Sequence, residues 1–419
     1  MIQIADGRDC PLRDAVILKT KDSIIVQKRT FPPHRLLMGP GPSNVHTRVL
    51  HAMARPTIGH LDPVFGSIME EIKTMLRSVF RTENALTIPL SAPGSVGMET
   101  CLVNLLEPGD TAIICVNGAF GGRMADIAQR CGAETVVIEQ SWGDAVDPSR
   151  VEDAFKGNPK ASLLAFVHAE TSTGVQSDVA ALCKIASAHD ALSVVDAVTS
   201  LGGIPVEVDA WGADAMYSGT QKCLSCPPGL SPLTIGERAA HRIKNRTQPV
   251  QSWFMDLGLV MSYWDGAGGR TYHHTAPVNA MYGLHEALTM LLEEGLEASW
   301  SRHAAMHDAL WAGLNALGLK RHVKKPQALP QLNTVCIPDG LEEAAVRRGL
   351  LENFDIEIGA GLGELAGKVW RVGLMGETAR PASVRRFLVS LEQTLGSFQK
   401  IDEPGQALVA AEDVLATNA

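Results

Sequence analysis

The segment LSVVDAVTSLGGIPVEVDAWGADAMYSGTQK (192–222) contains two short apolar runs, LSVVDA (192–197) and DAMYSG (214–219), each followed by turn-forming residues. Both runs are nearly continuous in apolar character rather than alternating, which is typical of strands covered on both faces in a mostly parallel sheet. Four earlier runs have the same character: ALTIPLSA (85–92), TAIICVN (111–117), TVVIE (135–139) and SLLAFVH (162–168). The sequence therefore predicts a buried, mostly parallel sheet.

Amphipathic stretches separate these runs, for example PVFGSIMEEIKTMLRSVF (63–80) and DVAALCKIASAHD (178–190). Strands that alternate with helices predict an α/β domain, with a large mostly parallel sheet and helices on both of its faces. A long helical pattern over 276–302 leads out of this domain, and the patterns that follow predict a smaller α+β domain. We therefore divide the chain into an N-terminal arm, a large domain, a small domain, and a tail or loose helix (1–48, 49–295, 296–400 and 401–419).

Composition restricts the class of protein. The chain has 419 residues, 45% apolar and 20% charged, close to the average of globular proteins and unlike a disordered chain. Its 37 basic and 46 acidic residues give a net charge of −9, the wrong sign for a nucleic-acid binder. No apolar run approaches the roughly 20 residues of a membrane span, and the first residues lack a signal-peptide pattern. We expect a soluble, cytoplasmic protein with no membrane or nucleic-acid partner, and its eight cysteines as reduced core thiols.

Lys222 ends the sequence SGTQK (218–222), just after the second of the two quoted runs. The carboxyl ends of strands form the edge at which open α/β sheets bind ligands. Burial there lowers the pKa of a lysine, so that its neutral amine can attack an aldehyde. An ordinary loop lysine is the alternative, since lysine readily reaches solvent. Cys223 and Cys226 form a single C-x-x-C pair without a second cluster, so we expect them to be packing residues and expect no metal site.

Asp196 lies at the end of the first quoted run, before VTSLGG (198–203). An unpaired carboxylate at the end of a buried strand is costly, so Asp196 needs a partner. Asp196 precedes Lys222 by about one strand-to-strand step, so the two side chains can lie side by side at one sheet edge. Such a pair suits pyridoxal 5′-phosphate (PLP). The lysine holds the aldehyde of PLP, and the aspartate pairs with its protonated pyridine nitrogen. A strand-end aspartate that caps the next turn is the alternative.

Five blocks of the sequence, in this order, resemble the class V, fold-type I PLP-dependent aminotransferases, specifically the alanine–glyoxylate and serine–glyoxylate group. They are LLMGPGPSN (36–44), Asp196, SGTQK (218–222), YHHT (272–275) and VWRVGLMG (369–376). The resemblance covers about residues 35–395. It implies that Lys222 forms the Schiff base with PLP and then moves the proton between substrate and cofactor. It also implies that Asp196 holds the pyridinium.

The resemblance also implies residues that hold the cofactor. In APGSVGME (92–99), Gly94 and Ser95 resemble the phosphate loop, where small residues before a helix let backbone N–H groups meet a dianion; a plain turn is the alternative. Phe120 stands where these enzymes stack an aromatic ring, in many relatives a tryptophan, on the pyridine; core packing is the alternative. Gln221, just before the lysine, corresponds to a phosphate ligand.

Two further segments carry implied cofactor contacts. In VHAETSTGV (167–175), Thr171 matches a hydroxyl beside the phenolic oxygen of PLP, whereas its neighbour Glu170 fits an N-cap or a solvated acid equally well. Tyr272 and Thr275 resemble the pair that reaches the phosphate from the neighbouring subunit, which implies a homodimer with active sites at the subunit interface. The adjacent histidines 273–274 would point opposite ways on an extended strand, so we expect no joint metal site.

Three residues are expected to contact the substrate. Arg371 matches the arginine that grips the α-carboxylate of the substrate through a bidentate fork. The alternative is an edge-strand arginine that pairs with an acid, since arginine is rarely buried unpaired. Gly41 in the first block, and His60 in IGHLDP (58–63), are expected to line the substrate pocket.

These features predict a ping-pong transaminase that moves an amino group from alanine or serine to a 2-oxo acid, glyoxylate. The rival within transamination is (S)-ureidoglycine–glyoxylate exchange in purine catabolism. A ureido group favours amide side chains, and His60 and Tyr272 offer less of this, which favours serine or alanine. A PLP lyase or desulfurase would need a catalytic cysteine on a loop, and Cys336 in the apolar run NTVCIP fits poorly. A catalytically silent PLP-fold protein would have lost the lysine, the aspartate or the arginine, and all three are present.

Overall fold

The computed structural model describes residues 15–19, 24–28, 30–264, 271–398 and 400–417. The chain divides into two units, residues 1–35 and 36–419. In the first unit, β1 (Ala15–Lys19) and β2 (Ile24–Lys28) pair as an antiparallel hairpin. All remaining elements belong to the second unit.

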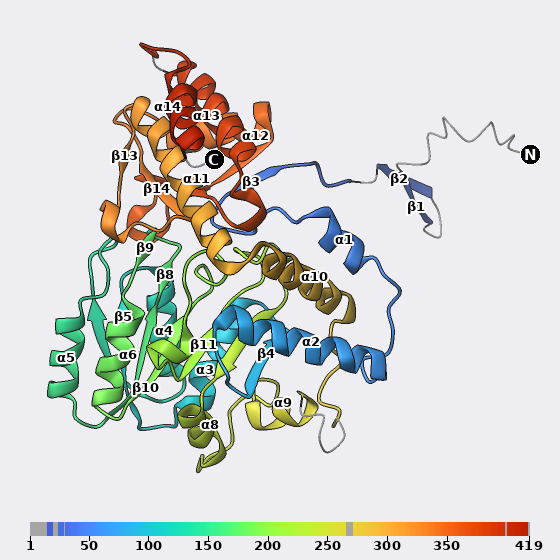
Figure 1. Ribbon diagram of the computed structural model, residues 1–419, viewed down its shortest axis with the longest axis vertical. Helices are drawn as coiled ribbons and strands as arrows, with labels where there is room; N and C mark the ends of the chain where they lie inside the picture. The colour runs from blue at the N-terminus through green and yellow to red at the C-terminus, as the bar shows by residue number, and fades with distance from the viewer. Residues whose placement is uncertain (1–14, 20–23, 29, 265–270, 399, 418–419) are drawn as a thin grey trace, which may run out of the picture. The chain divides into compact units, whose positions relative to one another are not determined.

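A seven-stranded sheet forms the base of the second unit (Figure 1). Its order is β4-β12-β11-β10-β7-β5-β6, with all neighbours parallel except for β12, which is antiparallel to β11 and β4. The strands are β4 (Leu86–Leu90), β5 (Thr111–Val116), β6 (Glu134–Glu139), β7 (Ala161–Val167), β10 (Leu192–Asp196), β11 (Ala215–Tyr217) and β12 (Ser231–Ile235). The predicted α/β class and the six predicted strands are confirmed.

Strand β12 was not predicted from the sequence. Its sequence SPLTI contains Pro232 and two hydroxyl residues, and proline inside a run argues against a central strand. Every residue of β12 is nevertheless buried, as are all residues of β4, β10 and β11. Because successive side chains of a strand point to opposite faces, this burial means that both faces of the sheet are covered.

Helices cover the sheet, and several begin where the sequence provides a cap. Asp62, Asp147 and Asp178 each accept a hydrogen bond from a backbone N–H of the first turn that follows them. The helices of this part are α1 (Thr47–Met53), α2 (Pro63–Phe80), α3 (Gly94–Leu105), α4 (Ala119–Arg130), α5 (Pro148–Gly157), α6 (Val179–Ala188), α7 (Val208–Trp211), α8 (Glu237–Lys244), α9 (Leu257–Trp264) and α10 (Val278–Glu294). The predicted helices at 63–80 and 178–190 are thus α2 and α6.

The long helical pattern over 276–302 is two helices rather than one. Helix α10 ends and α11 (Leu296–Ala316) begins at Gly295, whose φ of +88° lies in the left-handed region that favours glycine. Helix α11 joins two cores: Leu296 at its start packs in that of the seven-stranded sheet, whereas its apolar residues from Met306 onward belong to a second core. The division of the chain near residue 295 stays a prediction.

A five-stranded sheet carries the second core; Figure 1 draws most of it in orange and red, and its edge strand β3 in blue. Its order is β13-β14-β16-β15-β3, antiparallel except for the pair β15 and β3. The strands are β13 (Lys320–Arg321), β14 (Leu332–Cys336), β15 (Ile356–Ala360), β16 (Val369–Gly373) and β3 (Leu36–Met38), and the helices are α11, α12 (Glu343–Phe354), α13 (Pro381–Gly396) and α14 (Gln406–Thr417). The part of the chain that the structure describes also contains short elements: β8 (Ala169–Glu170), β9 (Val175–Gln176), η1 (Lys325–Gln327), η2 (Gly363–Leu365) and η3 (Gly376–Thr378).

Both ends of the second unit differ from the sequence-based division. Leu36–Met38, which we assigned to an N-terminal arm, is the edge strand β3 of the five-stranded sheet. The segment assigned to a tail or loose helix contains α14, which buries Ala407, Ala411 and Leu415 in the second core. Short or Ala-rich segments of this kind carry too weak a periodic signal to be placed from sequence. Within the described residues, no helix has the length and apolar character that a bilayer crossing needs.

Candidate active site

Lys222 lies in the segment that follows β11, and its side chain is buried. Its ammonium group donates a hydrogen bond to the Pro40 carbonyl oxygen. Gly41 leaves room for it, because a Cβ added there would lie 2.7–3.0 Å from the Cδ, Nζ and Cε atoms of Lys222. Burial lowers the pKa of Lys222 to about 8; the negative charge of Asp196 opposes this shift and the positive charge of Arg371 adds to it. A buried amine with a lowered pKa is what the sequence predicted for a reactive lysine, and an ordinary solvated loop lysine is excluded.

Asp196 is the last residue of β10 and lies directly opposite Tyr217 of β11. The backbone N–H of Val198 donates to its Oδ1 (2.8 Å), and the Tyr217 hydroxyl donates to its Oδ2 (2.6 Å). Burial raises the pKa of Asp196 to about 6, and these two hydrogen bonds oppose the rise. The turn-capping role that we considered for Asp196 is therefore present on one oxygen, while Tyr217 is a site neighbour that was not predicted from the sequence.

Arg371 lies in β16, between β14 and β15, so it is not on an edge strand. Its guanidinium is buried and donates to two backbone carbonyl oxygens, those of Ala360 (2.6 Å) and Thr171 (3.1 Å). Within the described residues it has no acidic partner at ion-pair distance, although the negative charge of Glu170 acts on it. Burial lowers the pKa of Arg371 to about 10. The positive charge of Arg371, which acts on Lys222, is thus available to a carboxylate from outside the chain.

Glu170 is fully buried, which excludes a solvated acid. Its carboxylate accepts hydrogen bonds from the Ser172 N–H (3.0 Å), the Ser172 hydroxyl (2.6 Å) and the Phe120 N–H (3.2 Å) in the first turn of α4. A Cβ on Gly118 would clash with the Glu170 side chain, so a glycine is required there. Burial raises the pKa of Glu170, and its hydrogen bonds oppose the rise. Glu170 thus ties β8 to the N-terminus of α4 and fixes the backbone of Phe120.

The aromatic ring of Phe120 is half-buried against the main core. The guanidinium of Arg123 covers it, 5.1 Å from the ring centroid, and also donates to the Ser95 hydroxyl (2.9 Å). Phe120 therefore has both a packing role and a connection, through Arg123, to the predicted phosphate loop.

The predicted phosphate loop opens helix α3, which has no side-chain cap. A Cβ on Gly94 would lie 3.2 Å from Val198 Cγ2 and 3.3 Å from the Ser218 carbonyl oxygen, so the loop packs closely on the segments after β10 and β11. Gln221 Oε1 is buried without a hydrogen-bond partner in the described part of the chain. Uncapped N–H groups at a helix start attract anions, and the loop packs on the two segments that carry Asp196 and Lys222.

His60, Tyr272 and Thr275 form part of a different region. The His60 ring lies 5.6 Å from the Tyr272 ring and 6.2 Å from the Tyr263 ring, so two of these predicted residues do come together. Tyr272 is 60% exposed, and Thr275 is exposed as well. No hydrogen bond, ion pair or ring contact of the described residues joins the three predicted residues to the lysine, aspartate and arginine of the buried cluster.

The two adjacent histidines differ from what the sequence predicted. Their Nδ1 atoms lie 2.7 Å apart, and His274 Nε2 lies 2.7 Å from the Ser91 hydroxyl, so His273 and His274 face each other rather than pointing opposite ways. The prediction was wrong because Thr271–Pro277 is not part of a strand. In the described part of the chain, no group of three or more His, Cys, Asp or Glu residues could hold a metal ion.

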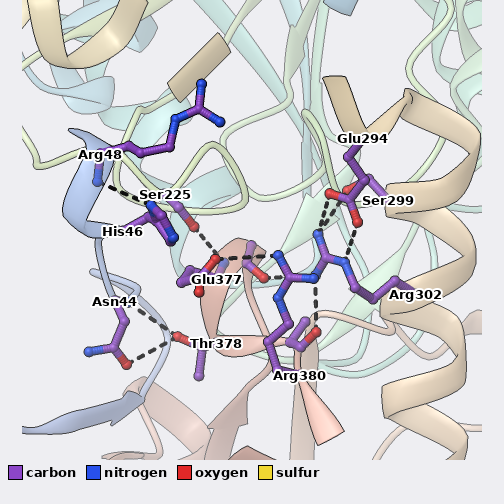
Figure 2. Close-up of polar contacts among 12 residues, drawn as sticks. Asn44, His46, Arg48, Ser225, Glu294, Ser299, Arg302, Glu377, Thr378 and Arg380 are labelled. Carbon is purple, nitrogen blue, oxygen red and sulfur yellow. Dashed lines mark hydrogen bonds and ion pairs between the residues drawn. The ribbon is translucent and has the colours of Figure 1, made fainter. Parts of the chain in front are cut away.

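A polar network surrounds Ser225, which follows the lysine in the chain, and Figure 2 shows its contact with Glu377. The Ser43 hydroxyl donates to the Lys222 carbonyl oxygen (2.7 Å), and the Glu377 N–H donates to the Ser225 hydroxyl (2.7 Å). A cavity of about 200 Å³ lies beside this network, and Glu294 and Arg302, which pair with each other, are among its lining residues. The cysteines that follow the lysine, 223 and 226, are buried free thiols whose pKa values burial raises to about 12.

The fold and this cluster define the class of protein. The structure contains a strand-end aspartate, a buried lysine in the segment after the neighbouring strand, an uncapped helix start at the predicted phosphate loop, and a buried arginine. Residues 42–376 match the family model described as aminotransferase class-V. The chain belongs to this family, which uses PLP, and the predicted enzyme class, an aminotransferase, is confirmed.

Three relatives illustrate the position of the chain within the family. The alanine–glyoxylate aminotransferase of Rattus norvegicus is 40% identical over 367 residues, 87% of this chain and 88% of the relative. The solved alanine–glyoxylate aminotransferase of Nostoc sp. is 46% identical with a TM-score of 0.86, covering 88% of this chain and 97% of that one. The solved ureidoglycine–glyoxylate aminotransferase of Bacillus subtilis is 39% identical with a TM-score of 0.90, covering 93% and 100%. The fold-type I architecture is thereby confirmed.

Proposed function

We propose that the chain transfers an amino group from a small amino acid, alanine or serine, to glyoxylate. The observation that carries this proposal is Arg371, a buried guanidinium without an acidic partner within the described residues, in the same cluster as Lys222. A buried guanidinium without an acidic partner favours a ligand with a carboxylate. The amino acid donor and glyoxylate each carry a carboxylate next to the reacting carbon. The likeness to glyoxylate aminotransferases supports the choice of glyoxylate as acceptor.

The residues of the cluster fit PLP. The uncapped N-terminus of α3, with Gly94 and Ser95, suits the phosphate, and the buried Gln221 Oε1, which has no partner among the described residues, marks a polar position next to it. Asp196 suits the ring nitrogen, and the half-buried Phe120 offers a flat face. Thr171, also buried, suits the phenolic oxygen. Bound there, PLP supplies an electron sink for the carbanion that forms when the substrate loses its α-proton.

The chain's own residues then divide the remaining work. The Lys222 amine, with its lowered pKa, holds the cofactor while the site waits for substrate, and it carries the proton once released. Arg371 orients the substrate through its carboxylate, with Gly41 leaving space beside the lysine. Burial of Lys222, Asp196 and Arg371 excludes water and strengthens the interactions of each charge with bound ligands.

The homodimer is part of the proposal. Tyr272 and Thr275 are exposed in the single chain, which fits a role in the phosphate site of a second copy. Further large apolar side chains are exposed as well, namely Leu50, Leu61, Val64, Trp253, Phe254 and Leu259. Where such side chains are contiguous, they are typical of a surface that another chain covers. The cytoplasmic location stays a prediction.

The rival donor is (S)-ureidoglycine, supported by the likeness to the Bacillus subtilis enzyme. Alanine or serine is favoured because His60 and Tyr272 lie together and neither offers the paired donor and acceptor of an amide. A desulfurase has less support, because Cys336 is the last residue of β14 rather than part of a loop. A catalytically silent protein is disfavoured by the buried lysine, aspartate and arginine.

A half-reaction panel tests the proposal. The PLP-loaded protein is mixed with alanine, serine, (S)-ureidoglycine or an amine without a carboxylate, and the loss of the cofactor's long-wavelength absorbance is followed. We expect fast loss with alanine or serine, full recovery on adding glyoxylate, and no loss with the amine. Fast loss with ureidoglycine alone would overturn the donor assignment, and a response to the plain amine would overturn the role of Arg371.

A further inference from the structure

Tyr217 donates a hydrogen bond from its side chain to Asp196, whereas Val198 donates from its backbone. Tyr217 ends β11, is fully buried, and its hydroxyl lies 2.6 Å from Asp196 Oδ2. The parallel register places the two residues directly opposite each other, so the bond depends on two rigid strands rather than on a loop. Hydrogen bonds to a charged acceptor in a buried site are the strong ones, and they fix both its orientation and its charge.

The charges around Asp196 determine what this hydrogen bond does to the protonation of the carboxylate. Besides Tyr217, the titratable groups that act on the carboxylate are Glu170 from β8, Lys222 from the segment after β11, and Cys101 from α3. Burial and the negative charge of Glu170 raise the pKa of Asp196, whereas Tyr217 and Lys222 lower it. Lysine changes its bonding when it holds a cofactor, so the constant stabilising partners are the Val198 N–H and the Tyr217 hydroxyl, of which only Tyr217 acts through its side chain.

We propose that Tyr217 is a positioning residue, which keeps the Asp196 carboxylate ionised and aimed at the ring nitrogen of the cofactor. An ionised aspartate leaves the proton on the pyridine ring, and the protonated ring is the stronger electron sink. Without the hydroxyl, the buried carboxyl keeps its own proton and the ring loses its positive charge. Tyr217 touches neither substrate nor cofactor in this scheme and acts through Asp196. The inference rests on the role proposed above for Asp196.

The test is a mutant cycle with two readouts besides activity. PLP is titrated into the apo forms of wild type, Tyr217→Phe, Asp196→Asn and the double variant, and the dissociation constant is followed from pH 5 to pH 9. Tyr282→Phe is the matched control, because Tyr282 is also buried and its hydroxyl donates to a backbone carbonyl, that of Pro56. Melting temperatures check that every variant is folded.

We expect Tyr217→Phe to weaken PLP binding about tenfold at pH 7, since a hydrogen bond to a charged group is lost. Its removal raises the pKa of Asp196, so the acid limb of the binding profile moves up by about one pH unit or more. In the Asp196→Asn background the same change is expected to alter binding less than about twofold. Turnover of Tyr217→Phe falls through kcat more than KM, and Tyr282→Phe behaves as wild type.

Two results would contradict the inference in distinguishable ways. Equal effects of Tyr217→Phe with and without the Asp196 carboxylate, or an unmoved acid limb, would show that the hydroxyl does not act through the charge of Asp196. If Asp196→Asn bound PLP as tightly as wild type, the proposed role of Asp196 would be wrong. The proposed cofactor geometry and this inference would then both fail.

Discussion

Two regions of the molecule supply residues for one proposed site, and they are built in opposite ways. At the carboxyl edge of the seven-stranded sheet, Lys222, Asp196 and Glu170 are buried and held by strand ends and helix starts. In the segment around residues 272–275, Tyr272 and Thr275 are exposed. The first region is therefore buried within one chain, whereas the second is exposed and, in the proposed homodimer, is covered by a partner. Substitutions in each region test this difference.

The largest effect is expected at the buried edge. Lys222→Ala removes both the attachment point of the cofactor and the amine that moves the proton, so we expect kcat to fall by about 10⁴-fold or more. Borohydride should fix the cofactor to wild type and not to the variant, as measured by mass spectrometry. The exposed Lys160→Ala is the control and should be unaffected. Substantial turnover without Lys222 would break the assignment of the site.

Arg371 tests the substrate side of the buried region. Arg371→Ala should weaken transition-state binding of α-carboxylate donors by on the order of 2–5 kcal/mol, because a buried charge-assisted fork is lost. The resulting fall in kcat/KM should come mainly from a higher KM. Arg371→Lys keeps the charge and should recover only part of the loss. Arg348→Ala, at an exposed position of α12, is the matched control. An unchanged KM would place the carboxylate elsewhere.

The lowered pKa of Lys222 predicts a pH dependence of cofactor capture. The neutral amine is the attacking form, so the capture rate should rise about tenfold per pH unit below pH 8 and level off above it. Arg371→Gln removes a positive charge that lowers this pKa, so the midpoint should move to higher pH. Stopped-flow absorbance after mixing apo-protein with PLP measures both. A midpoint near that of a solvated lysine would contradict the burial of the amine.

The exposed region is expected to give the smallest effect and the sharpest test of the dimer. Tyr272→Phe with Thr275→Ala should weaken PLP binding about tenfold, since phosphate hydrogen bonds are lost. Mixing this variant with inactive Lys222→Ala should restore activity, because one site of each mixed dimer then has every residue intact. Activity that stays at the average of the two separate proteins would show that no site is shared between chains.

The same contrast explains what sequence could and could not predict. Asp196 and Lys222 were found because the first ends an apolar strand and the second follows one, and strand ends are visible in a sequence. Tyr217 was missed because it looks like any apolar residue of its run, and its role depends on the register between two strands. The relation of His273 to His274 was wrongly predicted because a strand was assumed where the chain turns. Short β3 and the Pro-containing β12 lack a pattern that separates them from loop.

Strand β3 has a mechanical consequence. A Cβ on Gly373 would clash with the Gly39 carbonyl oxygen, and one on Gly359 would lie 2.5 Å from Pro40 Cδ, so the chain after β3 is clamped to β15 and β16. Arg371 sits on β16, and Gly41 follows directly on this clamped stretch. Any rigid-body movement of the five-stranded sheet therefore moves Arg371 and Gly41, the two proposed substrate contacts, together, and the hydrogen bonds from Lys222 to Pro40 and from Ser43 to the Lys222 carbonyl oxygen couple that movement to the lysine segment.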